Sequence, residues 1–589
     1  MTMTAMLEPR TVWHFPTTVV VSDELAAVGA AAGLSRRVVE IFARRGIDEP
    51  DALRRFLAPP DLALHDPRLL PDADRFAQRI AAARRAAERV MVFGDFDADG
   101  LSGLATMTLA LRAIGLVVEP YVPSRLDEGH GLSLQAVEAA ARGGTGVIVT
   151  VDCGSSSRPE IAAAAERGID VLVTDHHRVP LELPPALAVV NPHRPDSRYP
   201  DDRLSGSGVA FKLAELLLAD VPGGPQLARS YAQLALIGTV SDVAPILGEN
   251  RAIARIGLEG LRTSPRAGLR ALLATAGVAP AAIDLETVAF AIAPRINAAG
   301  RVGEALDAAR LLLTEDDGQA AELATRLDQA NVSRRALTKA AVDEAEAIVR
   351  ATDLGEAAIV VRGSWPVGIV GLVAARLAES RRRPAIVGST LDAMVRASCR
   401  GSGGLDLGAA LDACADLLVR HGGHAGAAGF EIETVHWDEF RSRFLALAEL
   451  APAPPDRPSL QLDLALPAGE LDYALLRELA VFEPTGTANP APLVAALGAT
   501  VSRVRAASGG HAQITLRRER DVIDAIAFGR GDLAETLHEG DRIDLVARLS
   551  SRVFAGYETL QLEIRDVAPS GSHPEAVTIL GLVAAGVPR

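Results

Sequence analysis

The stretch RVMVFGDFDADGLSGLATMTLALRAIG, residues 89–115, decides the fold. It opens on an apolar run of the kind that forms a buried parallel strand. A turn rich in Gly and Asp follows, and then a helical pattern with Leu101, Leu104 and Leu109 near one face. One strand followed by one helix is the repeating unit of an α/β domain.

The same unit recurs further along the chain. TGVIVTVDCG at 145–154 is followed by the helical PEIAAAAERG at 159–168, and then by IDVLVTDHH at 169–177. Short runs rich in Val and Ile suit strands that are buried on both faces. We therefore expect the α/β fold class, beginning with a doubly wound parallel-sheet domain.

The remaining pattern divides the chain further. The run APAPPDRPS has four prolines in nine residues and predicts a linker, because proline cannot continue a helix or a central strand. Short strand-like pieces after it predict a small β-barrel. We expect an N-terminal region at 1–70, the first α/β domain at 71–255, a helical connector at 256–350, a second α/β domain at 351–450, the linker at 451–459, the barrel at 460–566 and a C-terminal tail at 567–589.

Composition indicates a folded protein of several domains. The chain has 589 residues, of which 49% are hydrophobic and 23% charged. Its longest uncharged stretches, such as 271–283 and 576–588, are broken by Gly or Pro and fall short of the roughly 18 residues that span a bilayer. The N-terminal residues show no secretion signal, so a cytoplasmic location is expected. Three cysteines without metal-ligand spacing fit a reducing compartment.

The formal charge of −15 does not decide whether the partner is a nucleic acid. Phosphate binding needs Lys and Arg, but a basic groove can lie within an acidic surface, and carboxylates that bind metal ions also lower the formal charge. Lys212 and Lys339 are the only lysines, which we attribute to genome composition.

Acidic residues follow three of the expected strands. They are the DFDADG run at 95–100, Asp152, and Asp175 with His176 and His177. Because the carboxyl ends of the strands in an open α/β sheet meet at one crevice, we expect these side chains to lie together. Asp242, after a later helical stretch, is a further candidate.

Oxygen ligands with one or two imidazoles predict a site for Mn²⁺ or Mg²⁺. So many acids would repel one another without cations between them, so we expect two metal ions. Such a pair, about 3.5–4 Å apart, activates water and stabilises the attacking and leaving oxygens of a phosphoryl group.

An EF-hand calcium loop is the rival interpretation of DFDADG, since it starts with the same pattern. It needs Glu at the twelfth position, where this chain has Thr106, and a helix rather than a strand before it. Taken singly, Asp152 is more simply a helix cap and Asp-His-His a solvated turn. Their common position at strand ends favours the metal site.

At these residues the sequence resembles the DHH phosphoesterase superfamily, named for the Asp-His-His at 175–177, and in particular its RecJ family. The resemblance runs from about residue 70 to about residue 565. It implies a DHH domain, a DHHA1 domain and a barrel similar to an OB-fold. Its further motifs, in matching order, are YVPSRLDEGHGL (121–132), VVNPHR (189–194), SGSGVAFKL (205–213), IAPRINAAGR (292–301) and HGGHAGAAG (421–429).

The resemblance also implies roles for single residues. His177 is a metal ligand or a proton donor beside the scissile phosphate, and with Asp152 it forms the expected catalytic pair. Which two acids of the 95–99 run bind metal directly stays open. The implied metal ligands are Asp95, Asp97, Asp99, Asp152, His176 and Asp242.

A second set of residues is implied to bind the substrate. Ser398 and Arg400 match the family's Ser-x-Arg, which holds a 5′-terminal phosphate, and Arg125 is a helper. A guanidinium suits this task because it forms two parallel hydrogen bonds to phosphate oxygens. The other candidates are Arg295, Asn297 and Arg301 along the path of the strand, where the asparagine equally suits a role in holding a loop, and His424 in the Gly-rich run.

Two stretches depart from the family pattern. Trp365-Pro366 stands where the family has Trp-His, which removes an imidazole, although proline suits the start of a helix. In the later block an aromatic residue of the family is lost, so DNA contacts there are in doubt; this chain reads Pro484-Thr485-Gly486-Thr487-Ala488-Asn489-Pro490.

The resemblance implies a 5′→3′ exonuclease that hydrolyses single-stranded DNA to mononucleotides in repair and recombination, with a single-strand-binding protein and a helicase as partners. Two alternatives stay open. One is a DHH phosphodiesterase for short oligonucleotides or cyclic dinucleotides, against which the barrel argues. The other is a non-catalytic DNA-binding scaffold, which would be expected to lose acids that are all present here.

Overall fold

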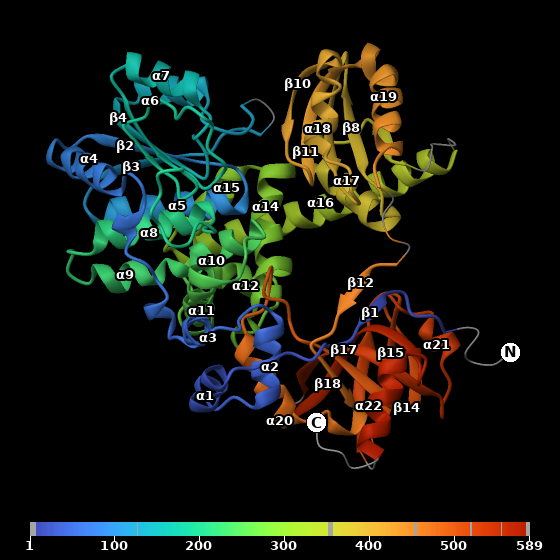
Figure 1. Cartoon of the computed structure of the whole chain (residues 1–589). Coiled ribbons are helices and arrows are strands. Elements are labelled where there is room, and N and C mark those ends of the chain that lie inside the picture. Colours follow the sequence, from blue (N-terminus) through green and yellow to red (C-terminus); the bar gives the residue numbers. More distant parts are fainter. Residues whose placement is uncertain are drawn as a thin grey trace. The chain divides into compact units, whose positions relative to one another are not determined.

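The computed structural model describes residues 7–125, 128–351, 357–452, 455, 457–518, 521–554 and 557–584 (Figure 1). The chain forms two compact units, a larger one at Pro60–Pro454 and a smaller one that joins Met1–Pro59 to Pro455–Arg589. Of the expected linker at 451–459, residues 453, 454 and 456 lie outside the described residues. Every helix among the described residues is too short or too polar to span a bilayer.

The first lobe of the larger unit is built on a parallel sheet. The strand order is β3-β2-β4-β5-β6, so the chain reverses direction across the sheet between β2 and β4. Ligands of open α/β sheets bind at such a switch point. The strands are β2 (Arg89–Gly94), β3 (Val117–Tyr121), β4 (Thr145–Val151), β5 (Asp170–Thr174) and β6 (Ala188–Val190).

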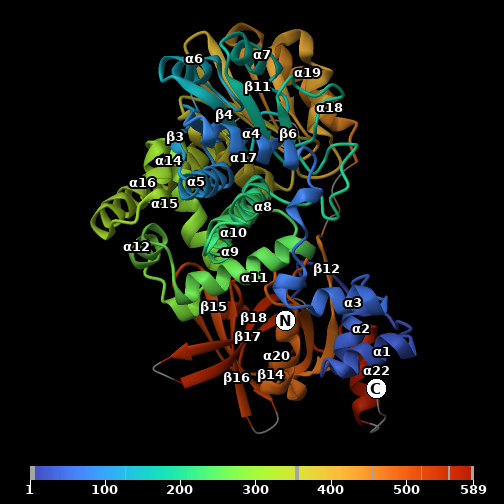
Figure 2. The ribbon, with the colours of Figure 1, turned by 90° about the vertical axis from the view of Figure 1, so that its left-hand side faces the viewer.

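Helices cover both faces of this sheet (Figure 2). Val90 and Val92 of β2 pack in one core with the helices α4, α5, α8 and α10, whereas Met91 and Phe93 pack on the other face with α6 and α7. The doubly wound domain expected from the sequence is confirmed. The helices are α4 (Ala73–Arg85), α5 (Ala98–Ala113), α6 (Leu134–Arg142), α7 (Arg158–Glu166), α8 (Gly206–Leu218) and α10 (Ala232–Ser241).

A helical region connects the two lobes of the larger unit, and its last helix belongs to both. Leu323 and Leu327 of α16 are buried in the core of the first lobe, and Ala341 and Ala345 are buried in that of the second. The long connecting helix expected from the sequence is therefore present. The principal helices are α11 (Gly248–Thr263), α12 (Ala267–Thr275), α14 (Ala293–Val302), α15 (Ala305–Leu313) and α16 (Asp317–Ala351).

The second lobe is a mixed sheet in the order β10-β11-β9-β8-β7. Helix α17 (Val367–Arg381) packs on one face, and α18 (Leu407–Asp412) and α19 (Trp437–Glu449) pack on the other. Pro366 caps the start of α17, as expected for a proline at this position. The strands are β7 (Ile359–Gly363), β8 (Ala385–Leu391), β9 (Met394–Arg400), β10 (Leu418–Gly423) and β11 (Ala427–Glu433).

The smaller unit contains a closed five-stranded barrel in the order β14-β15-β16-β18-β17, in which β17 returns to β14. This is the strand order of an OB-fold, and the barrel expected from the sequence is confirmed. Strand β13 (Leu464–Pro467) pairs beside β14. The barrel strands are β14 (Leu493–Ala507), β15 (His511–Arg518), β16 (Asp521–Ala527), β17 (Arg542–Phe554) and β18 (Tyr557–Pro569).

The start of the chain belongs to this barrel unit. Strand β1 (Val12–His14) pairs with β12 (Ser459–Gln461), and Phe42 of α2 (Arg36–Arg44) packs 4.4 Å from Phe482, measured between ring centroids. For residues 1–70 the local pattern carried no expectation beyond an N-terminal region. Strand β1 pairs with a segment more than four hundred residues later in the chain, so its partner could not be predicted from the neighbouring sequence.

One buried carboxylate fixes this start of the chain. Asp566 of β18 accepts hydrogen bonds from the backbone of Arg10 at 3.1 Å and of Thr11 at 2.9 Å, from the Thr11 hydroxyl at 2.6 Å and from the Trp13 indole at 3.0 Å. Its side chain is fully buried, and Arg530 lies 3.5 Å away. Such a carboxylate compensates for its burial through these donors.

Candidate active site

The register of the first sheet places four polar residues in one row. Gly94 pairs with Val151, Val151 with Thr174, and Thr174 with Val190. The residues that follow these positions are Asp95, Asp152, Asp175 and Asn191, and all four are buried. Parallel pairing therefore turns acids that are far apart in sequence into neighbours, as expected.

The backbone of the loop after β2 and of the first turn of α5 fixes the positions of Asp95, Asp97 and Asp99. Asp97 caps α5, since its Oδ1 accepts hydrogen bonds from the backbone N–H groups of Asp99 and Gly100, both at 3.0 Å. A Cβ at Gly100 would lie 2.6 to 2.8 Å from the backbone of Asp95, so glycine is required for this tight turn. Asp99 accepts backbone hydrogen bonds from Gly206 at 2.8 Å and Ser207 at 2.9 Å.

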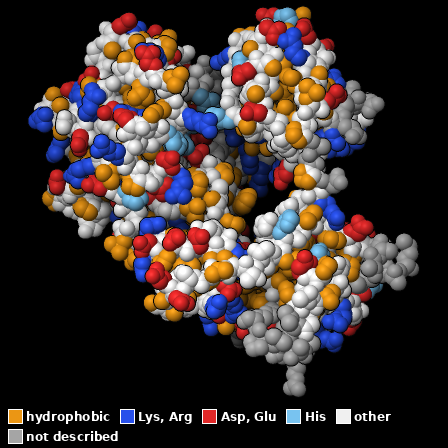
Figure 3. Space-filling model, in the orientation of Figure 1, with side chains coloured by type: hydrophobic (Ala, Val, Ile, Leu, Met, Phe, Trp, Pro, Cys, Tyr) orange, Lys and Arg blue, Asp and Glu red, His pale blue; other side chains and the backbone are white. Residues whose placement is uncertain are grey.

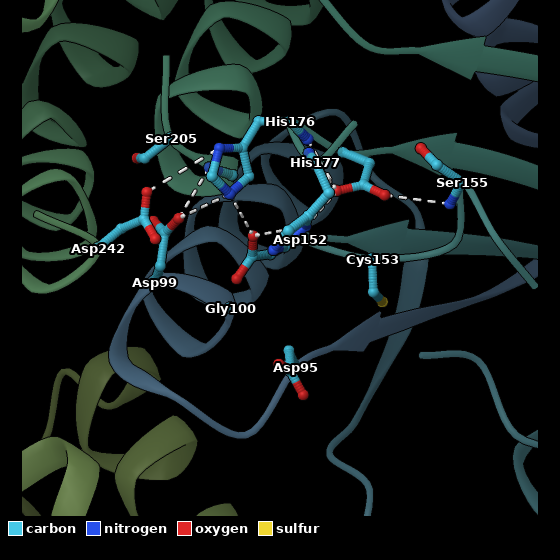
Figure 4. A network of polar contacts seen from close by, with 12 residues as sticks. Asp95, Asp99, Gly100, Asp152, Cys153, Ser155, His176, His177, Ser205 and Asp242 are labelled. Carbon is cyan, nitrogen blue, oxygen red and sulfur yellow. Dashed lines mark hydrogen bonds and ion pairs between the residues drawn. The ribbon is translucent and has the colours of Figure 1, made fainter. Parts of the chain in front are cut away.

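Asp152 lies at the centre of the acids. Its backbone is in the left-handed region at φ 61°, and its side chain is 4% exposed. Carboxylate Oδ1 is buried and makes no hydrogen bond to any described residue, while Nε2 of His176 lies 3.1 Å away (Figure 4). A backbone strained in this way, holding an unsatisfied buried oxygen, is typical of a functional site.

His176 faces acids from three separate segments. Besides Asp152, its Nε2 lies 3.9 Å from Oδ2 of Asp99, and its Nδ1 lies 3.9 Å from Oδ2 of Asp242 (Figure 4). Asp242 comes from the end of α10, and Asp99 from the first turn of α5. The structure thus brings together the candidate metal ligands from all of these segments.

His177 and Asp175 form a separate pair beside this cluster. Nδ1 of His177 lies 2.8 Å from Oδ1 of Asp175, and this hydrogen bond raises the pKa of His177 to about 9. Burial opposes ionisation of Asp175, but its hydrogen bonds from His177 hold the pKa of that carboxyl well below its usual range. The amide of Asn191 donates hydrogen bonds to the His177 carbonyl at 2.8 Å and to Ser155 Oγ at 3.1 Å. The pair is therefore rigidly placed.

The central acids repel one another. Burial, followed by the charges of neighbouring carboxylates, raises the pKa of Asp97 to about 6 and that of Asp242 to about 7, and it raises the pKa of Asp152 well above its usual value. In the absence of a cation, the carboxylates of the cluster therefore bind protons, which reduce the repulsion between them. Divalent metal ions would neutralise these carboxylates and would give the unsatisfied oxygen of Asp152 a partner, so the residues present fit such ions.

A pocket of about 1020 Å³ joins these acids to the second lobe. Arg and His side chains gather in the hollow between the two lobes (Figure 3). Asp95, Asp97, Asp152, His177 and Asp242 line one wall. The opposite wall is the part of the second sheet formed by β9, β11 and β10.

Ser398 and Arg400 lie on this opposite wall. Arg400 donates hydrogen bonds to Ser398 Oγ at 3.1 Å and to the Cys399 carbonyl at 2.8 Å. Helix α17 approaches closely, since a Cβ at Gly371 would lie 3.1 Å from Ser398 Oγ and 3.2 Å from Nη2 of Arg400. Burial lowers the pKa of Arg400, and no carboxylate among the described residues compensates, so the site is arranged for an anion.

Arg125 lies between the two walls. Its guanidinium stands 4.8 Å from the centre of the Phe96 ring, and its pKa is lowered by burial and by the charge of Arg400, against the pull of Asp95 and Asp97. His424 also lines the pocket. Ser398, Arg400 and Arg125 therefore share one pocket with four of the six predicted metal ligands, which are Asp95, Asp97, Asp152 and Asp242.

Three predicted substrate-binding residues make contacts within the protein instead of lining this pocket. Arg295 pairs with Asp328 at 2.9 Å. Asn297 accepts a hydrogen bond from the Ala98 backbone at 2.8 Å and donates one to Ser241 Oγ at 3.0 Å, so it holds the start of α5 against the end of α10. Arg301 donates to the Gly368 carbonyl at 3.1 Å, and burial followed by the charge of Arg125 lowers its pKa to about 10.

Sequence reasoning missed two residues of the site. His130 places Nδ1 3.1 Å from Oδ2 of Asp95, and its ring lies 4.5 Å from that of Phe96. Asn191 supports His177 as described. Both stand in the quoted motifs at 121–132 and 189–194, but a lone histidine or asparagine in a loop carries no signal of its own.

Comparison with known proteins agrees with this geometry. Models of the DHH family N-terminal domain, the DHHA1 domain and the RecJ OB domain match residues 89–239, 355–450 and 462–566. The single-stranded-DNA-specific exonuclease RecJ of Bacillus subtilis is 35% identical over 93% of this chain and 70% of its own length. That of Escherichia coli is 31% identical over 90% of this chain and 95% of its own length. The chain belongs to the RecJ family.

RecJ structures match most of the chain. The crystal structure of Thermus thermophilus RecJ in complex with Mn²⁺ has a TM-score of 0.78 and 30% identity, covering 95% of this chain and 79% of that one. The Mg²⁺ complex of the same RecJ has a TM-score of 0.73, with 95% and 78% covered. The resemblance to the RecJ family inferred from the motifs is therefore confirmed.

Proposed function

We propose that the protein is a metal-dependent exonuclease that removes mononucleotides from single-stranded DNA in the 5′→3′ direction. The observation that carries this proposal is the shared pocket, in which carboxylates and imidazoles face Ser398 and Arg400. RecJ relatives, named as single-stranded-DNA-specific exonucleases, support the choice of substrate.

The donor set fits two divalent cations, Mn²⁺ or Mg²⁺, and the metal-bound RecJ structures support this choice. We infer one cation held by Asp99, His176, Asp242 and Asp152, and a second held by Asp95, Asp97 and Asp152. Three groups bring their donor atoms within 4.8 Å of one another: Asp99 with His176 and Asp242, Asp95 with Asp97 and Asp152, and Asp152 with His176 and His177. Such cations would lower the pKa of water and neutralise charge on the phosphodiester.

The chain's own residues position the strand. Ser398 and Arg400, helped by Arg125, hold the 5′-terminal phosphate, and the next phosphate then faces Asp97 and Asp152. Nδ1 of His177 is engaged by Asp175, which leaves Nε2 to donate a proton to the departing 3′ oxygen of the first nucleotide. Hydrolysis there leaves a new 5′ phosphate on the shortened strand, so the same anchor serves each cycle.

The barrel unit extends the proposal beyond the pocket. OB-folds bind single strands through charged grooves and base stacking, so we assign the barrel the task of holding the strand downstream. A helicase partner belongs to the same proposal, since duplex DNA must be unwound before a single-strand-specific enzyme can act on it. The proposal also includes a single-strand-binding protein as a partner, roles in repair and recombination, and a cytoplasmic location.

The test compares labelled substrates with Mn²⁺ and with a chelator. A 5′-phosphorylated single strand should yield mononucleotides only when metal is present, while a blunt duplex and a cyclic dinucleotide should stay intact. Preferred cleavage of the dinucleotide would favour the phosphodiesterase alternative. Strand binding without any hydrolysis would favour the scaffold alternative.

A further inference from the structure

The pocket wall of the second lobe is organised in rows across three strands. Residues that pair across β9, β11 and β10 present their side chains on the same face of the sheet. Ser398 pairs with Gly429, and Gly429 pairs with Gly422. The next row on this face comprises Arg396, Glu431 and Arg420.

The first row is a strip without bulky side chains. Gly429 and Gly422 continue directly from Ser398, and all three residues line the pocket. A Cβ at Gly422 would meet no atom of the described residues within 4 Å, so this glycine leaves open space above the strand. The strip therefore offers a flat surface beside the proposed phosphate anchor.

The second row is an ion triad. Glu431 lies 2.5 Å from Nε of Arg396 and 2.6 Å from Nη2 of Arg420. The glutamate side chain is 15% exposed, whereas the side chain of Arg420 is 63% exposed. One carboxylate thus holds two guanidinium groups in fixed orientations at the edge of the strip, with a net positive charge.

We propose, on the basis of the proposed exonuclease function, that the strip and the triad form a nucleoside subsite in which the base of the 5′-terminal nucleotide rests against the Arg420 guanidinium. Two residues along a strand, about 7 Å, separate the Ser398 row from the triad row. A nucleotide whose phosphate is held at Ser398 would extend across the strip toward the triad.

The chemistry of the wall favours a guanidinium as the stacking partner. Among the described residues that line the pocket, Phe430 is the only Phe, Tyr or Trp, and it is buried on the opposite face of the sheet. A guanidinium plane stacks on nucleobases as an aromatic ring does. Because every base has such a face, this contact would tolerate any sequence.

The experiment pairs a protein change with a substrate change. Turnover is compared on 5′-phosphorylated single strands that carry either a normal or an abasic 5′-terminal nucleotide. The wild type should prefer the normal end by about tenfold in kcat/KM, the effect of one stacked base. Arg420→Ala should reduce this preference to near unity by slowing hydrolysis of the normal end alone.

Two further variants sharpen the test. Arg420→Lys keeps the charge but not the plane, so it should behave like Arg420→Ala. Arg443→Ala breaks ion pairs to Asp416 and Glu439 on the outer helix of the same lobe and should keep the wild-type preference. Equal losses on both ends in Arg420→Ala, or full preference in Arg420→Lys, would overturn the subsite. Wild-type protein that cleaves neither strand would instead count against the exonuclease function.

Discussion

Asp152 contributes to the site through its charge and destabilises the fold through the same charge. Its buried Oδ1 has no hydrogen-bond partner among the described residues, and burial with neighbouring carboxylates raises its pKa. Asp152→Asn should therefore lower hydrolysis by about a thousandfold or more, because several kcal/mol of transition-state stabilisation are lost. At alkaline pH the same variant should unfold at a higher temperature without metal, since the repelling charge of the ionised carboxyl is removed.

Both effects can be followed on one preparation, by single-turnover cleavage and by thermal unfolding in chelator. Asp220→Asn, at an exposed position, is the matched control and should change neither. A variant that keeps its turnover would remove Asp152 from the site.

Arg400 has a narrower task than the acids. Its pKa is lowered by burial, and no carboxylate in the described part of the chain pairs with it, which supports the proposal that a phosphate is its partner. Arg400→Ala should reduce the preference for 5′-phosphorylated over 5′-hydroxyl strands by about tenfold to a hundredfold, the worth of a charged hydrogen bond. Competition between the two labelled strands measures this ratio, and an unchanged ratio would contradict the anchoring role.

Single residues mark the limit of what could be predicted. The acids at strand ends were predictable, because parallel strands bring their carboxyl ends together whatever the loops do. The contact of His130 with Asp95 spans 35 residues, and that of Asn297 with Ala98 spans 199. Neither contact follows from local pattern, because the packing of α14 against α5 brings Asn297 to Ala98, and the tertiary position of residues 128–132 brings His130 to Asp95.

At the scale of elements, the close packing of α17 against β9 sets the anchor. The Cβ position of Gly371 lies within 3.2 Å of both Ser398 Oγ and Arg400. Gly371→Val should displace these side chains and reduce the preference for a 5′ phosphate about as strongly as Arg400→Ala. Ala375→Val, one turn further along the same helix, is the matched control and should keep the wild-type preference.

The helix itself should survive this change, since valine is slightly better than glycine in a helix interior, by a few tenths of a kcal/mol. Circular dichroism and the melting temperature should therefore stay close to wild type while end selection falls. Loss of helical signal would show that the effect comes from unfolding.

The sequence predicted some helices and strands better than others. The strand–turn–helix pattern at 89–115 was sufficient for the first sheet, and its alternation in sequence implied parallel pairing. Residues 7–59 carried no such signal, because β1 pairs with β12 and α2 packs against Phe482 from the far end of the sequence. Because these partners are so remote in the sequence, the local pattern of this segment can predict an amphipathic helix but not what the helix packs against.

At the scale of the whole molecule, acidity and metal should act together on stability. The pKa values of Asp97 and Asp242, about 6 and about 7, exceed the usual 3.8. The native state therefore holds protons that the unfolded chain releases, so metal-free protein should lose stability as pH rises from about 4 to 7. For one such acid, a difference of about 2 between the native and unfolded pKa values corresponds to roughly 3 kcal/mol.

Divalent cations bind only the deprotonated acids, so Mn²⁺ should raise the melting temperature more at pH 8 than at pH 5.5. Melting curves at both pH values, with metal and with chelator, give this difference. Asp97→Asn should flatten the dependence on pH in the chelator series. A gain from Mn²⁺ that is larger at the lower pH would contradict the linkage.

The smaller unit depends on a different carboxylate. Asp566→Ala would leave the buried indole donor of Trp13 and the part-buried backbone donor of Thr11 without an acceptor, which should cost about 3 kcal/mol. Limited proteolysis should then cut near residues 10–20 while the larger unit resists. Asp521→Ala, on an exposed position of the same barrel, should leave the cleavage pattern unchanged.

The split of the barrel unit between two distant segments of the chain has a consequence during synthesis. Residues 7–59 leave the ribosome long before the strands and Phe482 that receive them. The nascent chain can complete the larger unit while its earlier segment still exposes Phe42 and Trp13 to solvent. This segment is where a chaperone would be needed until the barrel strands emerge.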